Sequence, residues 1–126
     1  MPRSLDPERL KQSFDAAFAG LAHVTHTQPN WRIHLGLATA AILGAVVLGL
    51  SVTEWAALIL ATGLVFAMEA MNTAIEATVD AIPVPRSPVT RHAKDAAAAA
   101  VLVAAFAALL VGFALFAPKL AALLLR

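Results

Sequence analysis

The stretch IHLGLATAAILGAVVLGLSVT, residues 33–53, contains no Asp, Glu, Lys or Arg. A second run without these residues covers 96–118, and a third begins at Trp55 and ends before Glu69. About 20 apolar residues in a helix cross the hydrocarbon core of a bilayer. The pattern therefore predicts a single-domain, all-α membrane protein. We expect three transmembrane helices, at about residues 33–52, 55–79 and 94–117.

The overall composition supports the membrane assignment. Of the 126 residues, 60% are hydrophobic and 13% are charged, whereas soluble domains have about 45–50% apolar and about 25% charged residues. The chain has no cysteine, which excludes disulfides and thiolate chemistry. The net charge is only +1 and the basic residues form no continuous stripe, so we expect no nucleic-acid partner.

The N-terminal segment predicts an amphipathic helix at about residues 7–25. Asp6 and Pro7 are typical of a helix start, because Asp accepts hydrogen bonds from free N–H groups and Pro favours the first helical position. Apolar side chains then recur at helical spacing: Leu10, Phe14, Phe18 and Leu21. We expect this helix to lie on the membrane surface. A helix packed on a soluble partner protein is the alternative.

The connecting segments indicate how the chain crosses the bilayer. Trp31 and Arg32 are typical of an aromatic and a basic anchor at the membrane interface. Residues 51–54 predict a short turn between the first two spans. The three prolines within residues 81–92 predict a non-helical loop.

The distribution of basic residues predicts the orientation. Seven of the nine Lys and Arg residues lie on one side of the predicted spans. These are Arg3, Arg9, Lys11, Arg32, Arg86, Arg91 and Lys94. Basic loops stay in the cytoplasm, so we expect a multi-pass protein of the plasma or inner membrane with a cytoplasmic N-terminus.

Small residues recur every fourth position in two spans. They are Gly36, Ala40 and Gly44 in the first, and Ala96, Ala100, Ala104, Ala108 and Gly112 in the third. Such residues let helices approach closely in lipid, although an Ala-rich composition also produces this spacing by chance. Because three spans enclose little interior, we expect the chain to oligomerise.

Polar residues of the second span form the candidate site. Glu69, Asn72, Thr73, Glu76 and Asp80 fall within roughly 100° of one helix face at about 100° per residue. A carboxylate inside a membrane costs several kcal/mol unless it is paired or hydrated, so it indicates function by default.

The depth of these residues follows from the helical rise. Counted from Trp55, Glu69 lies about 21 Å along the helix and Glu76 about 31 Å, at roughly 1.5 Å per residue. The first distance falls within a hydrocarbon core about 30 Å thick and the second at its edge. Across the loop, Lys94 is placed to meet a phosphate, and we expect Asp95 to lie at a helix N-terminus.

The stretch from Glu69 to Asp80, followed by Ala93-Lys94-Asp95, resembles the signature of the small prokaryotic integral-membrane diacylglycerol kinases. This family includes the undecaprenol kinases of Gram-positive bacteria. The resemblance covers nearly the whole chain. It includes Ser13-Phe14, Ala17-Phe18, Gly20-Leu21 and Asn30-Trp31-Arg32-Ile33-His34. Of these motifs, Arg32-Ile33-His34 is more similar to the undecaprenol kinase branch.

The resemblance implies a homotrimer with active sites shared between protomers at the cytoplasmic interface. It implies that Glu69 is the catalytic base and that Asn72 positions the lipid hydroxyl; we add Thr73 and Asp95 as candidate substrate-binding residues. It further implies that Glu76 and Asp80 serve the metal and the nucleotide. The residues that match phosphate contacts of the family are Arg9 and Lys94.

The chain departs from the family pattern on the nucleotide side. Gln28 stands where the family usually has a second metal-binding Glu. Mg²⁺ prefers hard oxygen ligands, so the amide oxygen of Gln28 is a candidate ligand without charge. Ala16 replaces a nucleotide-contacting Tyr, and the segment around Pro85-Arg86-Ser87 replaces Glu-Tyr-His of the family.

Three functions are compatible with these features. The first is a lipid kinase that uses ATP and Mg²⁺ to phosphorylate undecaprenol or diacylglycerol. The second is a small ion-coupled transporter in which Glu69 carries a proton, although Glu76 and Asp80 cluster toward one surface instead of lining a path. The third is a catalytically weakened homologue that acts as a membrane assembly subunit, as the changes at Gln28 and Ala16 suggest.

Overall fold

The computed structural model describes residues 6–83 and 87–125, and the regular secondary structure in these ranges is helical. The helices are α1 (Pro7–Thr27), α2 (Pro29–Leu48), α3 (Val52–Ala81) and α4 (Pro88–Leu124). The last three are each long and apolar enough to cross a membrane. The all-helical class predicted from the sequence is confirmed, and so is the presence of three helices that could span a membrane.

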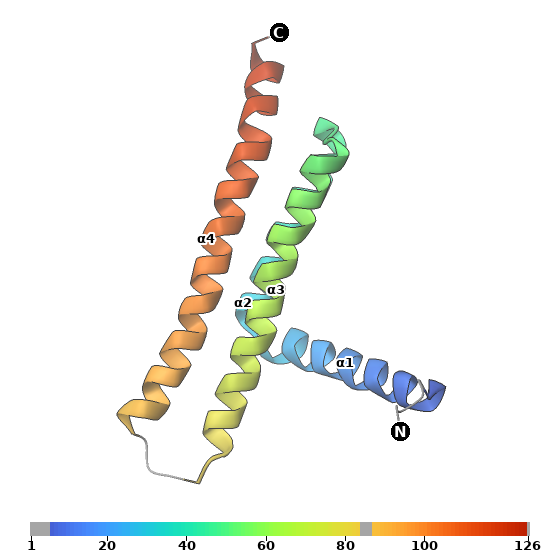
Figure 1. Cartoon of the computed structure of the whole chain (residues 1–126). Coiled ribbons are helices and arrows are strands. Elements are labelled where there is room, and N and C mark those ends of the chain that lie inside the picture. The colour runs from blue at the N-terminus through green and yellow to red at the C-terminus, as the bar shows by residue number, and fades with distance from the viewer. Residues whose placement is uncertain (1–5, 84–86, 126) are drawn as a thin grey trace.

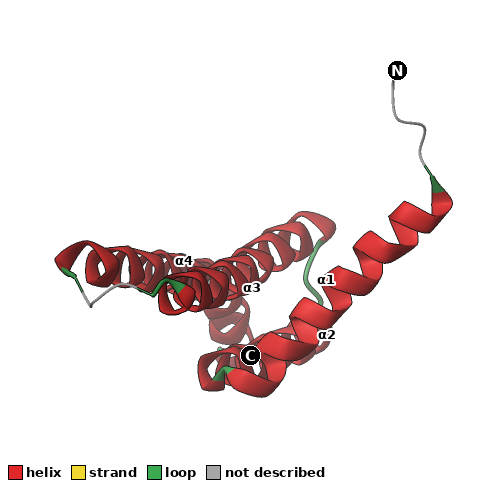
Figure 2. Cartoon of the chain, turned by 90° about the horizontal axis from the view of Figure 1, so that it is seen from below, coloured by secondary structure: helices red, strands yellow, loops and turns green. Residues whose placement is uncertain are grey.

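The helices form a loose bundle with one projecting arm (Figure 1). α3 and α4 run antiparallel side by side and share the most extensive contact, while α2 packs behind α3 with a smaller one. α1 leaves the bundle at a steep angle, and its N-terminal end lies far from α3 and α4 (Figure 2). Consequently, most side chains of the three long helices are exposed in a single chain.

Local hydrogen bonds explain where the helices begin. The Asp6 side chain accepts from the backbone N–H of Glu8 at 3.1 Å, which confirms the predicted start of α1. Before α3, Ser51 and Glu54 form a reciprocal capping box, an arrangement that satisfies two free N–H groups at once. α2 ends at Leu48, and the next residue is Gly49, whose φ of 66° favours glycine at a helix terminus.

The loop between α3 and α4 is shorter than predicted. Residues 81–92 were expected to be non-helical, but α3 includes Ala81 and α4 begins at Pro88. Pro88 occupies the first turn of the helix, where its missing N–H has no cost, and Ser87 caps this turn through Thr90. The prediction failed because a proline was interpreted as a helix breaker at a position where it starts one.

The other end of α4 extends beyond the predicted span. Pro118 lies inside the helix, which continues to Leu124. Beyond the proline, Lys119 Nζ lies 3.1 Å from Glu54 Oε2 at the start of α3. This ion pair joins α3 and α4 at the end of the bundle opposite their connecting loop.

Trp31 does not act as an interfacial anchor. Its side chain is buried, and its ring centroid lies 4.8 Å from that of Phe66 on α3, with the rings tilted by 59°. Aromatic pairs favour such tilted arrangements. The tryptophan therefore packs the start of α2 against α3, whereas Arg32 is exposed.

The ridges of small residues predicted for two spans coincide only in part with the faces of α2 and α4 that pack against other helices. On α4, Ala97, Val101 and Ala104 are buried, whereas Ala96 and Ala100 of the predicted ridge are exposed. On α2 the buried small residues are Ala38 and Ala45, whereas Gly36 and Ala40 are exposed. Alanine is so frequent in these helices that spacing alone did not select the packed face.

One cluster of the hydrophobic core lies at the end of the bundle away from the α3–α4 loop. Ala45, Leu50 and Leu58 are buried together, with Trp55 and Phe116 packed against them. By contrast, the four apolar residues that define the predicted face of α1 are exposed: Leu10, Phe14, Phe18 and Leu21. Of the residues used in the sequence argument, Arg3, Pro85 and Arg86 lie outside the described ranges.

Candidate functional site

Glu69 is the most deeply buried charged residue of the described chain. Only 2% of its surface is exposed. Its Oε1 lies 3.4 Å from His34 Nε2 on α2 and has no hydrogen-bond partner. One turn later, the Thr73 hydroxyl donates to the Glu69 backbone carbonyl at 2.9 Å, so it leaves the carboxylate free. Burying a carboxylate that lacks a full set of partners costs several kcal/mol, which favours a functional role over a structural one.

Asn72 and Glu76 form a second pair one turn apart on α3. The Asn72 amide donates to Glu76 Oε1 at 3.3 Å, and Asn72 Oδ1 is buried without a hydrogen-bond partner. A pair at this spacing stabilises a helix by only about 0.2–0.5 kcal/mol. The contact therefore matters more for orienting the Glu76 carboxylate than for stability.

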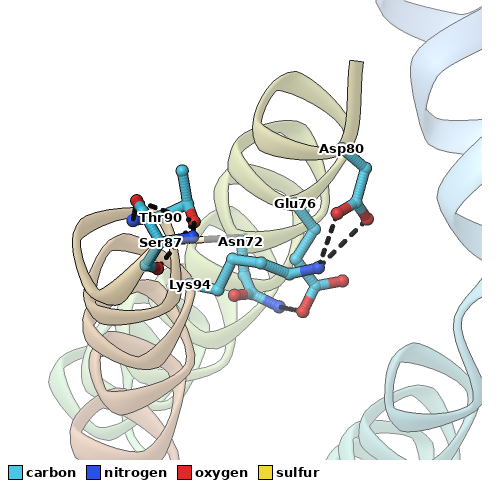
Figure 3. Close-up of polar contacts among 6 residues, drawn as sticks. All are labelled: Asn72, Glu76, Asp80, Ser87, Thr90 and Lys94. Atoms are coloured by element: carbon cyan, nitrogen blue, oxygen red, sulfur yellow. Dashed lines mark hydrogen bonds and ion pairs between the residues drawn. The ribbon is translucent and has the colours of Figure 1, made fainter. Parts of the chain in front are cut away.

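Asp80 and Lys94 connect α3 to α4 at the same end of the bundle. Lys94 Nζ donates to Oδ1 and Oδ2 of Asp80 at 2.9 and 3.0 Å. Figure 3 shows the Lys94 side chain reaching from α4 across to α3, with its ammonium group beside the Glu76 and Asp80 carboxylates. An ammonium group has three donors, so Lys94 retains capacity for a further acceptor such as a phosphate.

The burial of these residues decreases along α3 from Glu69 to Asp80. Glu69 and Thr73 are buried, Asn72 and Glu76 are half-buried, and Asp80 is exposed. Exposure therefore increases along α3 toward the loop that leads to α4. One helix thus offers a carboxylate in an apolar setting and two more near water.

Three predicted site residues are not brought to this cluster by the single chain. Within residues 6–83 and 87–125, neither Arg9 nor Gln28 forms a side-chain hydrogen bond or an ion pair with it. Arg9 lies near the projecting end of α1. Asp95 lies about two turns inside α4, not at its N-terminus, and its Oδ2 is 3.7 Å from Arg91 Nε at an exposed position.

The oxygen atoms of the cluster are candidate ligands for the Mg²⁺ that the resemblance implies. The described residues contain no group of three or more His, Asp or Glu side chains that would hold a metal ion by themselves. Mg²⁺ in phosphoryl-transfer sites needs only one or two carboxylates, with waters and substrate phosphates completing its shell. Glu76 and the unpartnered oxygen of Asn72 fit this requirement, because both present oxygen atoms.

Sequence reasoning did not assign a site role to His34. The histidine is half-buried. Within the described residues, it is the basic side chain that lies within ion-pair distance of Glu69. A signal was present, because His34 is an ionisable residue inside a charge-free run. Its facing partner depends on how α2 packs against α3, which periodicity does not determine.

An apolar cavity of about 620 Å³ adjoins His34 between α2, α3 and α4. Its lining residues are apolar or small except for His34 and Thr62, and the Thr62 hydroxyl already donates to the Leu58 carbonyl. Along α2 the lining runs from His34 to Leu48, about 21 Å at roughly 1.5 Å per residue. The cavity is therefore an apolar space with His34 at one end of its α2 lining.

These features define a class of protein: a small three-span membrane protein with a buried carboxylate and a charged cluster at one end. Comparison with known proteins gives the family. The family described as prokaryotic diacylglycerol kinase matches residues 15–116. This range includes the candidate site residues on α3 and α4 and Gln28, but not Arg9.

Two characterised relatives are similar over most of this chain. One is named undecaprenol kinase, from Bacillus subtilis (strain 168), and is 38% identical over 112 residues, which cover 89% of this chain and 91% of the relative. The other is named diacylglycerol kinase, from Synechocystis sp., and is 42% identical over 114 residues. That match covers 89% of this chain but 65% of the relative, just under two thirds of its length. The chain therefore belongs to the prokaryotic diacylglycerol kinase family and is a membrane lipid kinase.

Proposed function

We propose that the protein transfers the γ-phosphoryl group of ATP to the hydroxyl group of a membrane lipid alcohol, either undecaprenol or diacylglycerol. The observation that carries this proposal is Glu69, a buried carboxylate that accepts no hydrogen bond from the described residues. A general base must lie within hydrogen-bond reach of the proton that it removes. A free carboxylate oxygen in an apolar setting suits a lipid hydroxyl.

The proposed reaction has one chemical step. Glu69 accepts the proton of the lipid hydroxyl while the hydroxyl oxygen bonds to the γ-phosphorus of ATP. The bond between that phosphorus and the β–γ bridging oxygen breaks, and ADP leaves. Asn72, one turn from Glu69 on the same face, orients the hydroxyl oxygen by donating the second hydrogen of its amide nitrogen, the first being donated to Glu76, with Thr73 beside it.

The lipid chain occupies the cavity between α2, α3 and α4 in this proposal. The apolar lining disfavours a charged ligand. His34 lines the cavity and lies beside Glu69, which supports an orientation with the lipid hydroxyl toward Glu69. Small-molecule sites of this kind are mostly apolar with a few polar groups that fix orientation. The cavity therefore supports a lipid substrate more than a soluble one.

The nucleotide lies at the more exposed end of α3. Phosphoryl transfer depends mainly on positioning and on neutralising charge. Lys94 provides a cation to the phosphates, and Glu76 and Asp80 provide carboxylates for a nucleotide-bound Mg²⁺. When bound, Mg²⁺ neutralises the charge of the β- and γ-phosphates. Asp95 is proposed to contribute at this level as a substrate-binding residue.

We further propose that the active protein is a homotrimer with shared sites. The exposed small residues Gly36, Ala40, Ala96 and Ala100 allow close approach of helices from other copies. In this arrangement Arg9 and Gln28 approach the Glu76 cluster of a neighbouring protomer. α1 lies on the cytoplasmic membrane surface with its exposed apolar residues in the lipid, and the N-terminus is cytoplasmic.

The proposal is tested with purified protein in lipid vesicles, supplied with γ-labelled ATP and either undecaprenol or diacylglycerol. We expect label in the phosphorylated lipid from at least one alcohol. An absence of labelled lipid from both would contradict the proposal and leave the assembly-subunit hypothesis. Proton flux without lipid phosphorylation would instead support the transporter hypothesis.

A further inference from the structure

His34 and Glu69 face each other across the interface between α2 and α3. The distance from His34 Nε2 to Glu69 Oε1 is 3.4 Å, and the side chains are 19% and 3% exposed. N–H···O hydrogen bonds most often measure 2.9–3.0 Å, so the two groups lie close to bonding distance without a formed bond. Oε1 has no other hydrogen-bond partner, so the site is arranged for a contact that is not yet made.

No other described side chain is a partner for the Glu69 carboxylate. Thr73 uses its hydroxyl on the Glu69 backbone carbonyl. The remaining ion pairs of residues 6–83 and 87–125 involve Asp80, Asp95 and Glu54 as their acids. The imidazole of His34 is therefore the side chain available to the Glu69 carboxylate. His34 also lines the apolar cavity, so it lies beside both the carboxylate and the proposed lipid site.

We propose that His34 is a positioning residue for Glu69. Its imidazole donates the Nε2–H to Glu69 Oε1 when substrate is bound, which fixes the carboxylate and leaves the second oxygen for the lipid hydroxyl. Contacts of catalytic groups are often long in the unliganded state and shorten in the complex. This inference rests on the proposed base role of Glu69 and adds a specific partner to it.

The role is tested with two substitutions at the same position. His34→Leu removes the donor but is compatible with the apolar surroundings, whereas His34→Gln retains an N–H donor at a similar reach. Hydrogen bonds to charged groups are worth enough to change a rate by about 10- to 100-fold. We expect His34→Leu to lower kcat by this factor with the KM for ATP within about twofold, and His34→Gln to retain kcat within about fivefold.

Two further variants separate positioning from packing. Leu37→Ala changes another α2 residue that lines the cavity, and we expect it to alter the KM for the lipid more than kcat. In a Glu69→Gln background, His34→Leu should have no additional effect on the residual rate, because residues that act through one another are not additive. Thermal unfolding of each variant in detergent monitors folding.

The outcomes distinguish this inference from the proposed function. If Glu69→Gln is inactive but His34→Leu retains kcat, the inference about His34 is overturned and the base role stands. If His34→Leu and His34→Gln lose kcat equally while remaining folded, the donor is not the relevant feature and the inference is also overturned. If Glu69→Gln retains the rate, the proposed base role itself fails.

Discussion

The ammonium group of Lys94 lies 2.9 Å from one carboxylate oxygen of Asp80 and 3.0 Å from the other. The contact joins the second turn of α4 to the end of α3, beside the Glu76 carboxylate (Figure 3). Exposed ion pairs contribute about 0.2–1 kcal/mol to stability, so this pair contributes little to holding the fold. Its proposed importance is that it keeps a cation beside the acids that serve the nucleotide.

Replacement of Lys94 tests this assignment. We expect Lys94→Ala to raise the KM for ATP at least tenfold, because a phosphate loses its cation, while the unfolding temperature changes little. Lys119→Ala is the matched control, since Lys119 lies on the same helix and forms its ion pair at the opposite end of the bundle. Steady-state kinetics with ATP as the varied substrate checks both. A KM for ATP that is unchanged in Lys94→Ala would remove Lys94 from the nucleotide site.

Glu76 is expected to act on the metal–nucleotide side. Glu76→Gln removes a charged oxygen ligand but retains a side chain of similar size, so Mg²⁺-dependent nucleotide binding should weaken. Titration of the nucleotide at several Mg²⁺ concentrations measures this effect. If the main change were instead in the KM for the lipid, the depth assigned to Glu76 along α3 would be wrong.

Gln28 is the position where this chain departs most consequentially from the family pattern. Gln28→Glu should restore a charged ligand, and the Mg²⁺ concentration for half-maximal activity should fall, because hard cations gain affinity with ligand charge. Gln12→Glu makes the same charge change on α1 and should leave the Mg²⁺ dependence unaltered. An equal response in the two variants would mean that residue 28 is not at the metal.

The cavity is expected to determine lipid binding. Ala108 lines it, so Ala108→Leu should fill part of the volume and raise the KM for the lipid severalfold while the KM for ATP stays constant. Ala107→Leu adds the same atoms at an adjacent, exposed residue that does not line the cavity. Kinetics with lipid as the varied substrate compares the two. Similar KM values for the lipid in both variants would place the lipid chain elsewhere.

Much of the fold could be predicted from the sequence because charge-free length and helical period are local properties. They were sufficient for the three spans and for the common face that runs from Glu69 to Asp80. The capping role of Asp6 was equally local. The family resemblance added the expected chemistry of these residues, which spacing alone does not provide.

The parts that failed depend on how helices pack. Trp31 is a typical interfacial residue by composition, but its burial against Phe66 is decided by the contact between α2 and α3. The proximity of His34 to Glu69 has the same origin. Asp95 was placed at a helix terminus because Pro88 was interpreted as part of a loop. The arrangement of Arg9 and Gln28 relative to Glu76 requires a second protomer, which a single sequence does not position.

The central claim is that Glu69 removes the proton of a lipid hydroxyl during phosphoryl transfer. Glu69→Gln preserves the size of the side chain but removes the base, and loss of a general base lowers rates by about 10²–10⁴-fold. Glu54→Gln is the matched control, because it makes the same change on α3 near the opposite end.

The most direct measurement is the rate at which label moves from γ-labelled ATP to lipid in vesicles, with nucleotide binding measured on the same samples. The account predicts that Glu69→Gln binds nucleotide nearly as the unmodified protein does and transfers label at less than about a hundredth of its rate, while Glu54→Gln transfers label normally. Retention of more than about a tenth of the rate by Glu69→Gln would contradict the assignment of Glu69 as the base.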